Sequence, residues 1–210
     1  MNDPAPIRIL VVDDHQLIRA GITTLILPES DMKVVSEASN GREAIGKYRE
    51  CQPDVTLMDL QMPEMCGVDA IVAIRNEFPD ARIIVLTTYT GDVQAQRAMK
   101  AGAQGYVLKN LLHKELLQTI RTVSGGRKAM AAEVAAGVAE HTGEEGLTPK
   151  EIDVLRLIAA GNANKEIAAQ LSITEETVKS RVKNILEKLG ANDRTHAVTI
   201  ALKRGIIDLS

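Results

Sequence analysis

Residues 7–15 of the chain read IRILVVDDH, an apolar and largely β-branched run that ends in two aspartates and a histidine. A run of this length and composition is typical of a strand inside a parallel sheet that is covered on both faces. Four further strand-like runs lie at Val34–Ala38, Val55–Met58, Ile83–Leu86 and Gly105–Leu108. Amphipathic stretches separate them, so five strands alternate with five helices. This alternation predicts an α/β domain with a doubly wound parallel sheet.

The composition is that of a globular protein. Hydrophobic residues make up 45% of the 210 residues and charged residues 25%, and this length allows two small domains. No apolar run approaches the roughly 20 residues that a membrane-spanning helix requires, and residues 1–15 lack the pattern of a signal peptide. Two cysteines, Cys51 and Cys66, are too few for a disulfide scaffold. We therefore expect a cytoplasmic protein with no membrane contact.

Charge is distributed unevenly along the chain, whose formal net charge is -3. Residues 147–210 contain ten Lys and Arg residues against eight Asp and Glu residues. The rest of the chain contains fifteen basic and twenty acidic residues. A weakly basic C-terminal part behind an acidic N-terminal part permits nucleic-acid binding without establishing it.

The sequence changes character after residue 125. Residues 127–141 are rich in alanine and predict a helix, and residues 142–146 (TGEEG) are typical of a flexible linker. From Leu147 onward the sequence has only helical patterns, at about 149–160, 164–171, 175–189 and 194–205. We therefore predict a first domain over 6–125, a helical linker over 126–146 and an all-α domain over 147–210.

Polar side chains stand where four of the predicted strands end: Asp13 and Asp14 at the first, Asp59 at the third, Thr87 at the fourth and Lys109 at the fifth. Ligands collect at the carboxyl ends of parallel strands. Crowded carboxylates repel one another, and a hard cation such as Mg²⁺ would offset that repulsion. One carboxylate could then attack phosphorus, while the lysine and threonine stabilise phosphoryl oxygens. A single aspartate at a strand end is more often a turn or capping residue, but five such coincidences together predict a phosphoryl-accepting site.

Four segments resemble the receiver domain of two-component response regulators: VVDDH (11–15), LMDLQMPEMCG (57–67), VLTTY (85–89) and AGAQGYVLK (101–109). The resemblance covers about residues 6–125 and implies a flavodoxin-like fold of five strands in the order 2-1-3-4-5, with a sensor histidine kinase as phosphodonor. It implies that Asp59 is the phosphoacceptor and that Mg²⁺ is bound by Asp13, Asp14, Asp59 and the backbone carbonyl of Gln61. It also implies roles for Thr87, Lys109 and Tyr106 in stabilising the phosphoryl group and in switching.

Two residues of this region have simpler interpretations from the sequence alone. An aromatic side chain such as Tyr106 on the last strand is more often a packing residue, and only its combination with Thr87 favours a switch. His15 could be a metal ligand or a phosphohistidine, but we interpret it as the first residue of a helix at the rim of the pocket.

Residues 164–189 have the spacing of a helix-turn-helix. A helix that starts at Asn162 or Asn164 is followed by a tight turn over Ser172–Thr174, and Thr174 can cap the next helix. On that second helix the face opposite the apolar stripe carries polar side chains, with further cations at its flanks: Thr177, Ser180, Lys183 and Asn184, then Lys179 and Arg181. Such a face suits the major groove of DNA, although its charges alone would also fit an ordinary solvated helix.

Four segments of this part resemble the LuxR-type helix-turn-helix of NarL/FixJ-type regulators: NKEIA (164–168), TVKSRV (177–182), ILEKL (185–189) and DRTHAV (193–198). The resemblance covers residues 147–207 and implies double-stranded DNA as partner, with Lys179, Ser180 and Lys183 at the contact. Arg181 stands where histidine is frequent, and whether it contacts a base or a phosphate stays open. The helix that starts near Asp193 is implied to pair two copies, which predicts a homodimer on two half-sites about one helical turn apart.

Together these features predict a non-enzymatic transcription regulator. Phosphorylation of Asp59 would draw Thr87 towards the phosphoryl group, turn Tyr106 inward and shift the chain to a dimeric DNA-binding state. One alternative is a phosphate sink whose autodephosphorylation is tuned by Gln61 and Tyr89. Another is a constitutive DNA binder whose receiver only dimerises. The sequence leaves open the kinase, the target genes and the dimer face.

Overall fold

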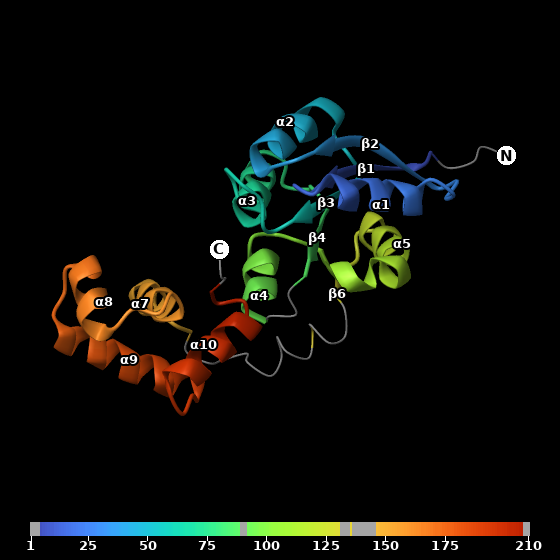
Figure 1. The fold of residues 1–210 in the computed structure, drawn as a ribbon. Helices are drawn as coiled ribbons and strands as arrows, with labels where there is room; N and C mark the ends of the chain where they lie inside the picture. Colours follow the sequence, from blue (N-terminus) through green and yellow to red (C-terminus); the bar gives the residue numbers. More distant parts are fainter. Residues whose placement is uncertain (1–4, 89–91, 131–134, 136–145, 208–210) are drawn as a thin grey trace. The chain divides into compact units, whose positions relative to one another are not determined.

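The computed structural model describes residues 5–88, 92–130, 135 and 146–207, which form two compact units (Figure 1). The first unit contains six strands: β1 (Ile7–Val12), β2 (Met32–Ala38), β3 (Val55–Asp59), β4 (Ile83–Thr87), β5 (Gly105–Leu108) and β6 (Ala129–Met130). Its helices are α1 (Gln16–Ile26), α2 (Gly41–Cys51), α3 (Gly67–Glu77), α4 (Asp92–Lys100) and α5 (Leu112–Ser124), with a short 3₁₀ helix η1 (Lys109–Leu111) before α5.

All strands of the sheet run parallel, in the order β2-β1-β3-β4-β5-β6. The predicted flavodoxin-like order 2-1-3-4-5 is confirmed, and the prediction of only five strands is wrong by one short strand. Ala129 and Met130 of β6 pair with Gly105 and Tyr106 of β5. They fall in the segment predicted to be helical, because two residues are too few to show a strand period, whereas the open edge of β5 offers unpaired backbone groups. Most of that segment and the TGEEG stretch lie outside the described residues.

The core explains why the strands read as continuous apolar runs. Along a strand, successive side chains point to opposite faces of the sheet. One face packs against α1 and α5, and its buried residues include Ile9, Val11 and Leu57 from the strands with Ile22 and Leu116 from the helices. Alternation directs the intervening strand residues to the opposite face, where α2, α3 and α4 lie (Figure 1). Both faces are therefore covered, and the polar groups at the strand ends meet at one edge.

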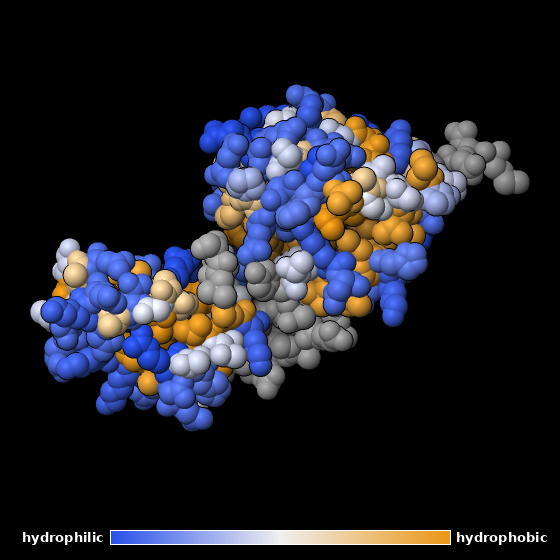
Figure 2. Space-filling view, in the orientation of Figure 1, coloured by the Kyte–Doolittle hydropathy of each residue, from blue (hydrophilic) through white to orange (hydrophobic). Residues whose placement is uncertain are grey.

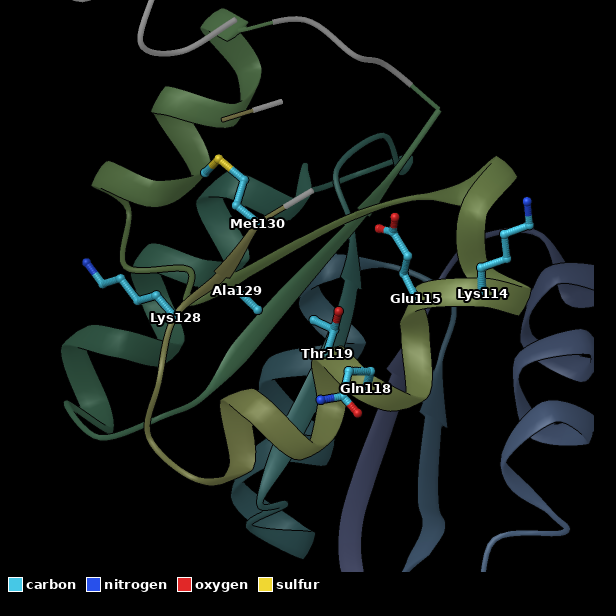
Figure 3. A pocket seen from close by; sticks show the side chains of 7 residues that line it. All are labelled: Lys114, Glu115, Gln118, Thr119, Lys128, Ala129 and Met130. Atoms are coloured by element: carbon cyan, nitrogen blue, oxygen red, sulfur yellow. The ribbon is translucent and has the colours of Figure 1, made fainter. Parts of the chain in front are cut away.

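A pocket of about 410 Å³ opens between α5 and β6 (Figure 3). Its lining mixes charged and neutral side chains: Lys114, Glu115, Gln118, Thr119, Lys128, Ala129 and Met130. None of these residues belongs to the site predicted from the strand ends. Among the described residues, no helix is long and apolar enough to cross a membrane.

The second unit is helical, as predicted, with α7 (Pro149–Ala159), α8 (Asn164–Leu171), α9 (Glu175–Leu189) and α10 (Arg194–Lys203) around a small core. Val154, Leu155, Ile167, Val178 and Ile185 lie in this core. The visible surface around α9 is mostly hydrophilic (Figure 2).

The helices of this unit begin either at a residue whose side chain caps the helix or at one whose N–H is bound by the side chain three positions later. Thr148 and Glu151 form a capping box at α7, with Pro149 in the first turn. Thr174 caps α9, as predicted, by accepting a hydrogen bond from Thr177 N. Of the two predicted starts of α8, Asn162 and Asn164, the helix begins at Asn164, and Ala163 takes the cap position. The Asn162 side chain instead donates to Leu157 O at 3.0 Å and accepts from Gln170 at 2.9 Å, which ties α7 to α8.

Candidate functional site

Strand register brings the polar strand ends together. Val12 lies beside Met58, Asp59 beside Leu86, and Thr87 beside Leu108, so Asp13, Asp59, Thr87 and Lys109 share the carboxyl edge of the sheet. Lys109 Nζ lies 2.6 Å from Asp13 Oδ2 and 2.9 Å from Asp59 Oδ2. The ammonium thus bridges two carboxylates that would otherwise repel each other. Asp13 is fully buried and Asp59 is 4% exposed.

The loop from β1 to α1 holds the acidic pair in place. Asp13 N donates to Ala38 O at 3.2 Å, and His15 N donates to Asp13 Oδ1 at 2.9 Å. Arg19 of α1 donates from a guanidinium nitrogen to the Asp13 main-chain oxygen at 2.7 Å and also bonds Glu37 at 3.1 Å. A charged donor on a backbone carbonyl is one of the stronger hydrogen bonds in proteins. Sequence reasoning missed Arg19, because nothing in the residue pattern links α1 to that carbonyl.

Gly67 lets α3 begin directly against Asp59. Its N–H donates to Leu60 O at 2.9 Å. A Cβ on this residue would lie 2.0 Å from the main-chain oxygen of Asp59, so only glycine fits. This close approach fixes the backbone of Asp59 and therefore the position of its carboxylate.

The electrostatics of the pocket follow from burial and from Lys109. Burial raises the pKa of Asp59 above its ordinary value, although the ammonium of Lys109 acts against this shift. Burial alone would lower the pKa of Lys109, but hydrogen bonds to Asp13 and Asp59 outweigh it, so this pKa lies above its ordinary value. The pocket therefore keeps a cation facing its carboxylates at neutral pH.

The donor set fits a divalent cation. Asp13, Asp14, His15 and Asp59 each offer a ligand atom, and these atoms lie within 4.8 Å of one another. Asp13 Oδ2 and Asp14 Oδ1 are buried, with Lys109 Nζ 2.6 Å from the first and His15 Nδ1 2.7 Å from the second. Carboxylate oxygens are the protein ligands that Mg²⁺ prefers. Gln61 adds its N–H, 3.4 Å from Asp59 Oδ1, at the same loop.

Thr87 and Tyr106 lie side by side in the sheet interior. Thr87 is 2% exposed and Tyr106 is 1% exposed. Burial raises the pKa of Tyr106 to about 12, and a hydrogen bond with Thr87 acts in the opposite direction. Tyr106 is thus already in the inward position that we expected only after phosphorylation. Tyr89, which we considered for tuning hydrolysis, lies outside the described residues.

The predicted DNA-contacting residues gather on one face of α9. Lys179, Ser180, Lys183 and Asn184 are exposed, while Thr177 and Arg181 are half-buried at its edge. Val178 and Ile185 anchor the opposite face in the core. The turn before α9 is made by Ser172 in the left-handed conformation, with φ 54°. The helix is thereby held with its polar side outward.

Lys188 of α9 has a different environment. Its Nζ lies 3.1 Å from Glu151 Oε2, and only 18% of the lysine side chain and 6% of the glutamate side chain are exposed. Burial would raise the pKa of Glu151, but hydrogen bonds from Thr148 and Lys188 outweigh it, so this pKa lies below its ordinary value. Lys188 therefore fastens α9 to α7.

A doubly wound sheet with a lysine-bridged acidic cluster at its carboxyl edge, joined in one chain to a helix-turn-helix unit, defines the response regulator class. The response regulator receiver domain family matches residues 9–121, and the family of bacterial regulatory proteins of the luxR type matches residues 145–201. The chain belongs to the LuxR-type response regulators.

Several relatives agree with this membership. The chain is 39% identical over 206 residues to response regulator protein VraR of Staphylococcus aureus (strain Mu3), covering 96% of this chain and 99% of VraR. A LuxR-family two-component response regulator from Aurantimonas is similar in structure, with a TM-score of 0.63 and 39% identity over 66% of this chain and 99% of that chain. The response regulator RcsB in complex with DNA gives a TM-score of 0.70 at 26% identity, covering 94% of this chain and 98% of RcsB.

Proposed function

We propose that the chain is a transcription regulator whose binding to DNA is controlled by phosphorylation of Asp59. The observation that carries the proposal is the position of Lys109, within 2.9 Å of the carboxylates of both Asp13 and Asp59. Because Asp59 shares its 4.8 Å cluster with Asp14 and with the exposed His15, a donor can approach from that rim.

The proposed reaction transfers a phosphoryl group from a phosphohistidine of a sensor histidine kinase. An oxygen of Asp59 attacks phosphorus, an O–P bond forms, and the N–P bond to the imidazole breaks. Asp13, Asp14, Asp59 and the Gln61 carbonyl would hold Mg²⁺, which supplies charge neutralisation when bound. Lys109 would keep its ammonium against the new phosphoryl oxygens as it now does against the carboxylates.

Phosphorylation would act on the buried pair of Thr87 and Tyr106. The phosphoryl group carries about two negative charges near neutral pH, in place of the single charge of the Asp59 carboxylate. If the Thr87 hydroxyl donates a hydrogen bond to the phosphoryl group, it no longer bonds the Tyr106 phenol. The hydrogen bond between Thr87 and Tyr106 would therefore couple the phosphorylation site to β5. The modification would shift an existing equilibrium between two states towards the dimeric, DNA-binding one.

DNA binding is proposed for the exposed face of α9. Lys179 and Lys183 supply positive charge, and Ser180 and Asn184 supply groups that pair with base edges or phosphates. The likeness to RcsB in its DNA complex supports this choice of unit. Pairing of two copies through α10 would place two such helices about one turn of DNA apart.

The phosphorylation step is tested with acetyl phosphate and Mg²⁺ on the full chain. Wild type should gain one acid-labile phosphoryl group, and Asp59→Asn should gain none. Persistent labelling of the variant would reject Asp59 as acceptor. DNA affinity measured with and without phosphodonor should differ; equal affinities would point to a constitutive binder, and labelling without any genomic footprint would point to a phosphate sink.

The DNA-binding face is tested by the salt dependence of affinity. Lys183→Ala should weaken binding, and if the lysine contacts phosphate, it should reduce the slope of log affinity against log salt by about one. Lys150→Ala on α7 is a matched control, because this lysine is also exposed but lies outside α9. A slope unchanged in Lys183→Ala together with unchanged affinity would remove this residue from the interface.

A further inference from the structure

The pocket between α5 and β6 shares no lining residue with the acidic site. Its volume of about 410 Å³ falls within the range of about 300–1,000 Å³ that is typical of small-molecule sites. Ala129 and Met130 of β6 form a largely apolar wall, and the facing side chains of α5 form a polar one (Figure 3). A hollow with both kinds of wall suits a small organic molecule rather than a bare ion.

Thr119 is the most deeply placed polar residue described for this pocket. It is only 9% exposed, and its hydroxyl forms no hydrogen bond with another described residue. A threonine inside a helix commonly donates to the carbonyl four residues earlier, and three helical threonines of this chain do so at 2.8 to 2.9 Å: Thr24, Thr122 and Thr199. A buried hydroxyl without a partner is destabilising. Because Thr119 lines the pocket, a bound molecule can supply the missing hydrogen bond.

Charged side chains surround this hydroxyl. Lys114 and Glu115 of α5 and Lys128 beside β6 line the pocket, and none of the three forms an ion pair with another described residue. Figure 3 shows the two lysines on opposite sides of the pocket. Two ammonium groups match the charge of about two that a phosphate monoester carries near neutral pH. A carboxylate only accepts hydrogen bonds, so the part of the molecule that faces Glu115 must carry donors such as hydroxyl groups.

We propose that this pocket binds a phosphorylated sugar, either free or as the sugar phosphate of a nucleotide. Lys114 and Lys128 hold the phosphate, and sugar hydroxyls donate to Glu115. Thr119 forms its missing hydrogen bond with another sugar oxygen, and Met130 packs against the ring. The inference goes beyond the proposed function, since it depends neither on phosphorylation of the chain nor on DNA.

The test is titration calorimetry on the full chain with glucose 6-phosphate and with adenosine monophosphate, compared with glucose and with inorganic phosphate. At least one of the two sugar phosphates should bind, and the tighter of the two identifies the source of the sugar. Glucose and inorganic phosphate each carry only part of the required chemistry, so both should bind at least about tenfold more weakly. Inorganic phosphate that binds as tightly as either sugar phosphate would reduce the site to an anion on surface lysines and overturn the inference.

Variants then locate the binding site. Thr119→Val should weaken sugar-phosphate binding by about fivefold, the equivalent of one hydrogen bond, and Thr119→Ser should restore it. Thr122→Val is the matched control, because this threonine of α5 already bonds Gln118 O and does not line the pocket. Lys128→Met should weaken binding by about tenfold or more. Lys33→Met should leave it unchanged, because this exposed lysine belongs to β2 at the opposite edge of the sheet.

The outcomes separate the possible occupants. Thr119→Val removes no hydrogen bond between described residues, so it should unfold at the wild-type urea concentration and its binding can be measured. Failure of wild type to bind either sugar phosphate, or binding that both Thr119→Val and Lys128→Met leave unchanged, would overturn the inference. An acidic peptide that bound in place of the sugar phosphates, with the same dependence on Thr119, would assign the pocket to a protein partner and overturn it as well. None of these results would alter the test of Asp59 as phosphoacceptor.

Discussion

Gly67→Ala should disable the phosphorylation site without removing any charged group. A methyl group at this position would lie 2.0 Å from the main-chain oxygen of Asp59 and 2.9 Å from Leu60 Cα. Favourable contacts between heavy atoms begin at about 3.5 Å, so the start of α3 and the end of β3 must separate by about 1 Å or more. Both partners are backbone, which cannot rotate away as a side chain could.

The magnitude follows from two costs. Overpacking of a tight contact costs about 1–3 kcal/mol. Moving α3 away also weakens the 2.9 Å hydrogen bond from Gly67 N to Leu60 O, whose loss costs about 1 kcal/mol. We therefore expect the free energy of unfolding to fall by about 2–4 kcal/mol. A displacement of about 1 Å at a reacting group lowers a rate about 100-fold, which is the expected fall in labelling of Asp59 by acetyl phosphate.

Urea unfolding and the rate of labelling measure the two effects. Gly21→Ala and Gly46→Ala are the controls: both glycines lie inside helices, α1 and α2, and an added Cβ at either would meet no heavy atom within 4 Å. In these variants the free energy of unfolding should rise by about 0.5–1 kcal/mol, and the labelling rate should stay at the wild-type value. Wild-type stability and labelling in Gly67→Ala would refute the claim that this contact positions Asp59.

Three further substitutions test how buried polar and charged side chains contribute to stability. Thr56→Val should raise the free energy of unfolding by about 1 kcal/mol, because the buried Thr56 hydroxyl has no hydrogen-bond partner among the described residues; calorimetry measures it. Lys188→Met should lower the free energy of unfolding by about 3 kcal/mol by stranding the buried Glu151, and should leave the salt slope of DNA binding unchanged. Lys109→Met should raise the pKa of Asp59 further, since burial already raises it and the opposing ammonium is lost. A raised folded-state pKa of a carboxyl means that the folded chain binds the extra proton, so this variant should gain stability as pH falls from 7 towards 5, which urea unfolding at both pH values can check.

Much of the acidic site could be predicted from the sequence because parallel strands deliver their carboxyl ends to one edge. Asp13, Asp59 and Lys109 are far apart along the chain, yet each directly ends a run whose composition marks it as a strand. Once the runs are recognised, the topology leaves these residues little choice of place. The contact of Lys109 with both carboxylates follows from this geometry.

The features that the sequence could not predict depend on contacts that leave no periodic pattern in the residues. The bond of Arg19 to the Asp13 carbonyl joins a helix side chain to a backbone group, and no residue pattern marks it. The strand β6 is too short to differ from its alanine-rich surroundings. The sequence also could not choose between Asn162 and Asn164 as the start of α8. The helix begins at Asn164, because Leu157 O and Gln170 hold the Asn162 side chain.

The lysines of α9 show that a helical wheel alone does not identify which polar side chains are exposed. Lys183 and Lys188 are five residues apart, and five residues advance the helix by about 140°, so the two side chains leave it in different directions. Lys183 is exposed, whereas Lys188 is directed to Glu151 and is 18% exposed. From the sequence alone both are polar residues of one helix. Only the packing of α7 against α9 shows that Lys188 is paired and Lys183 is not buried. A count of positive charges on α9 therefore overstates the charge available to DNA, and the salt dependence of binding should follow the exposed lysines alone.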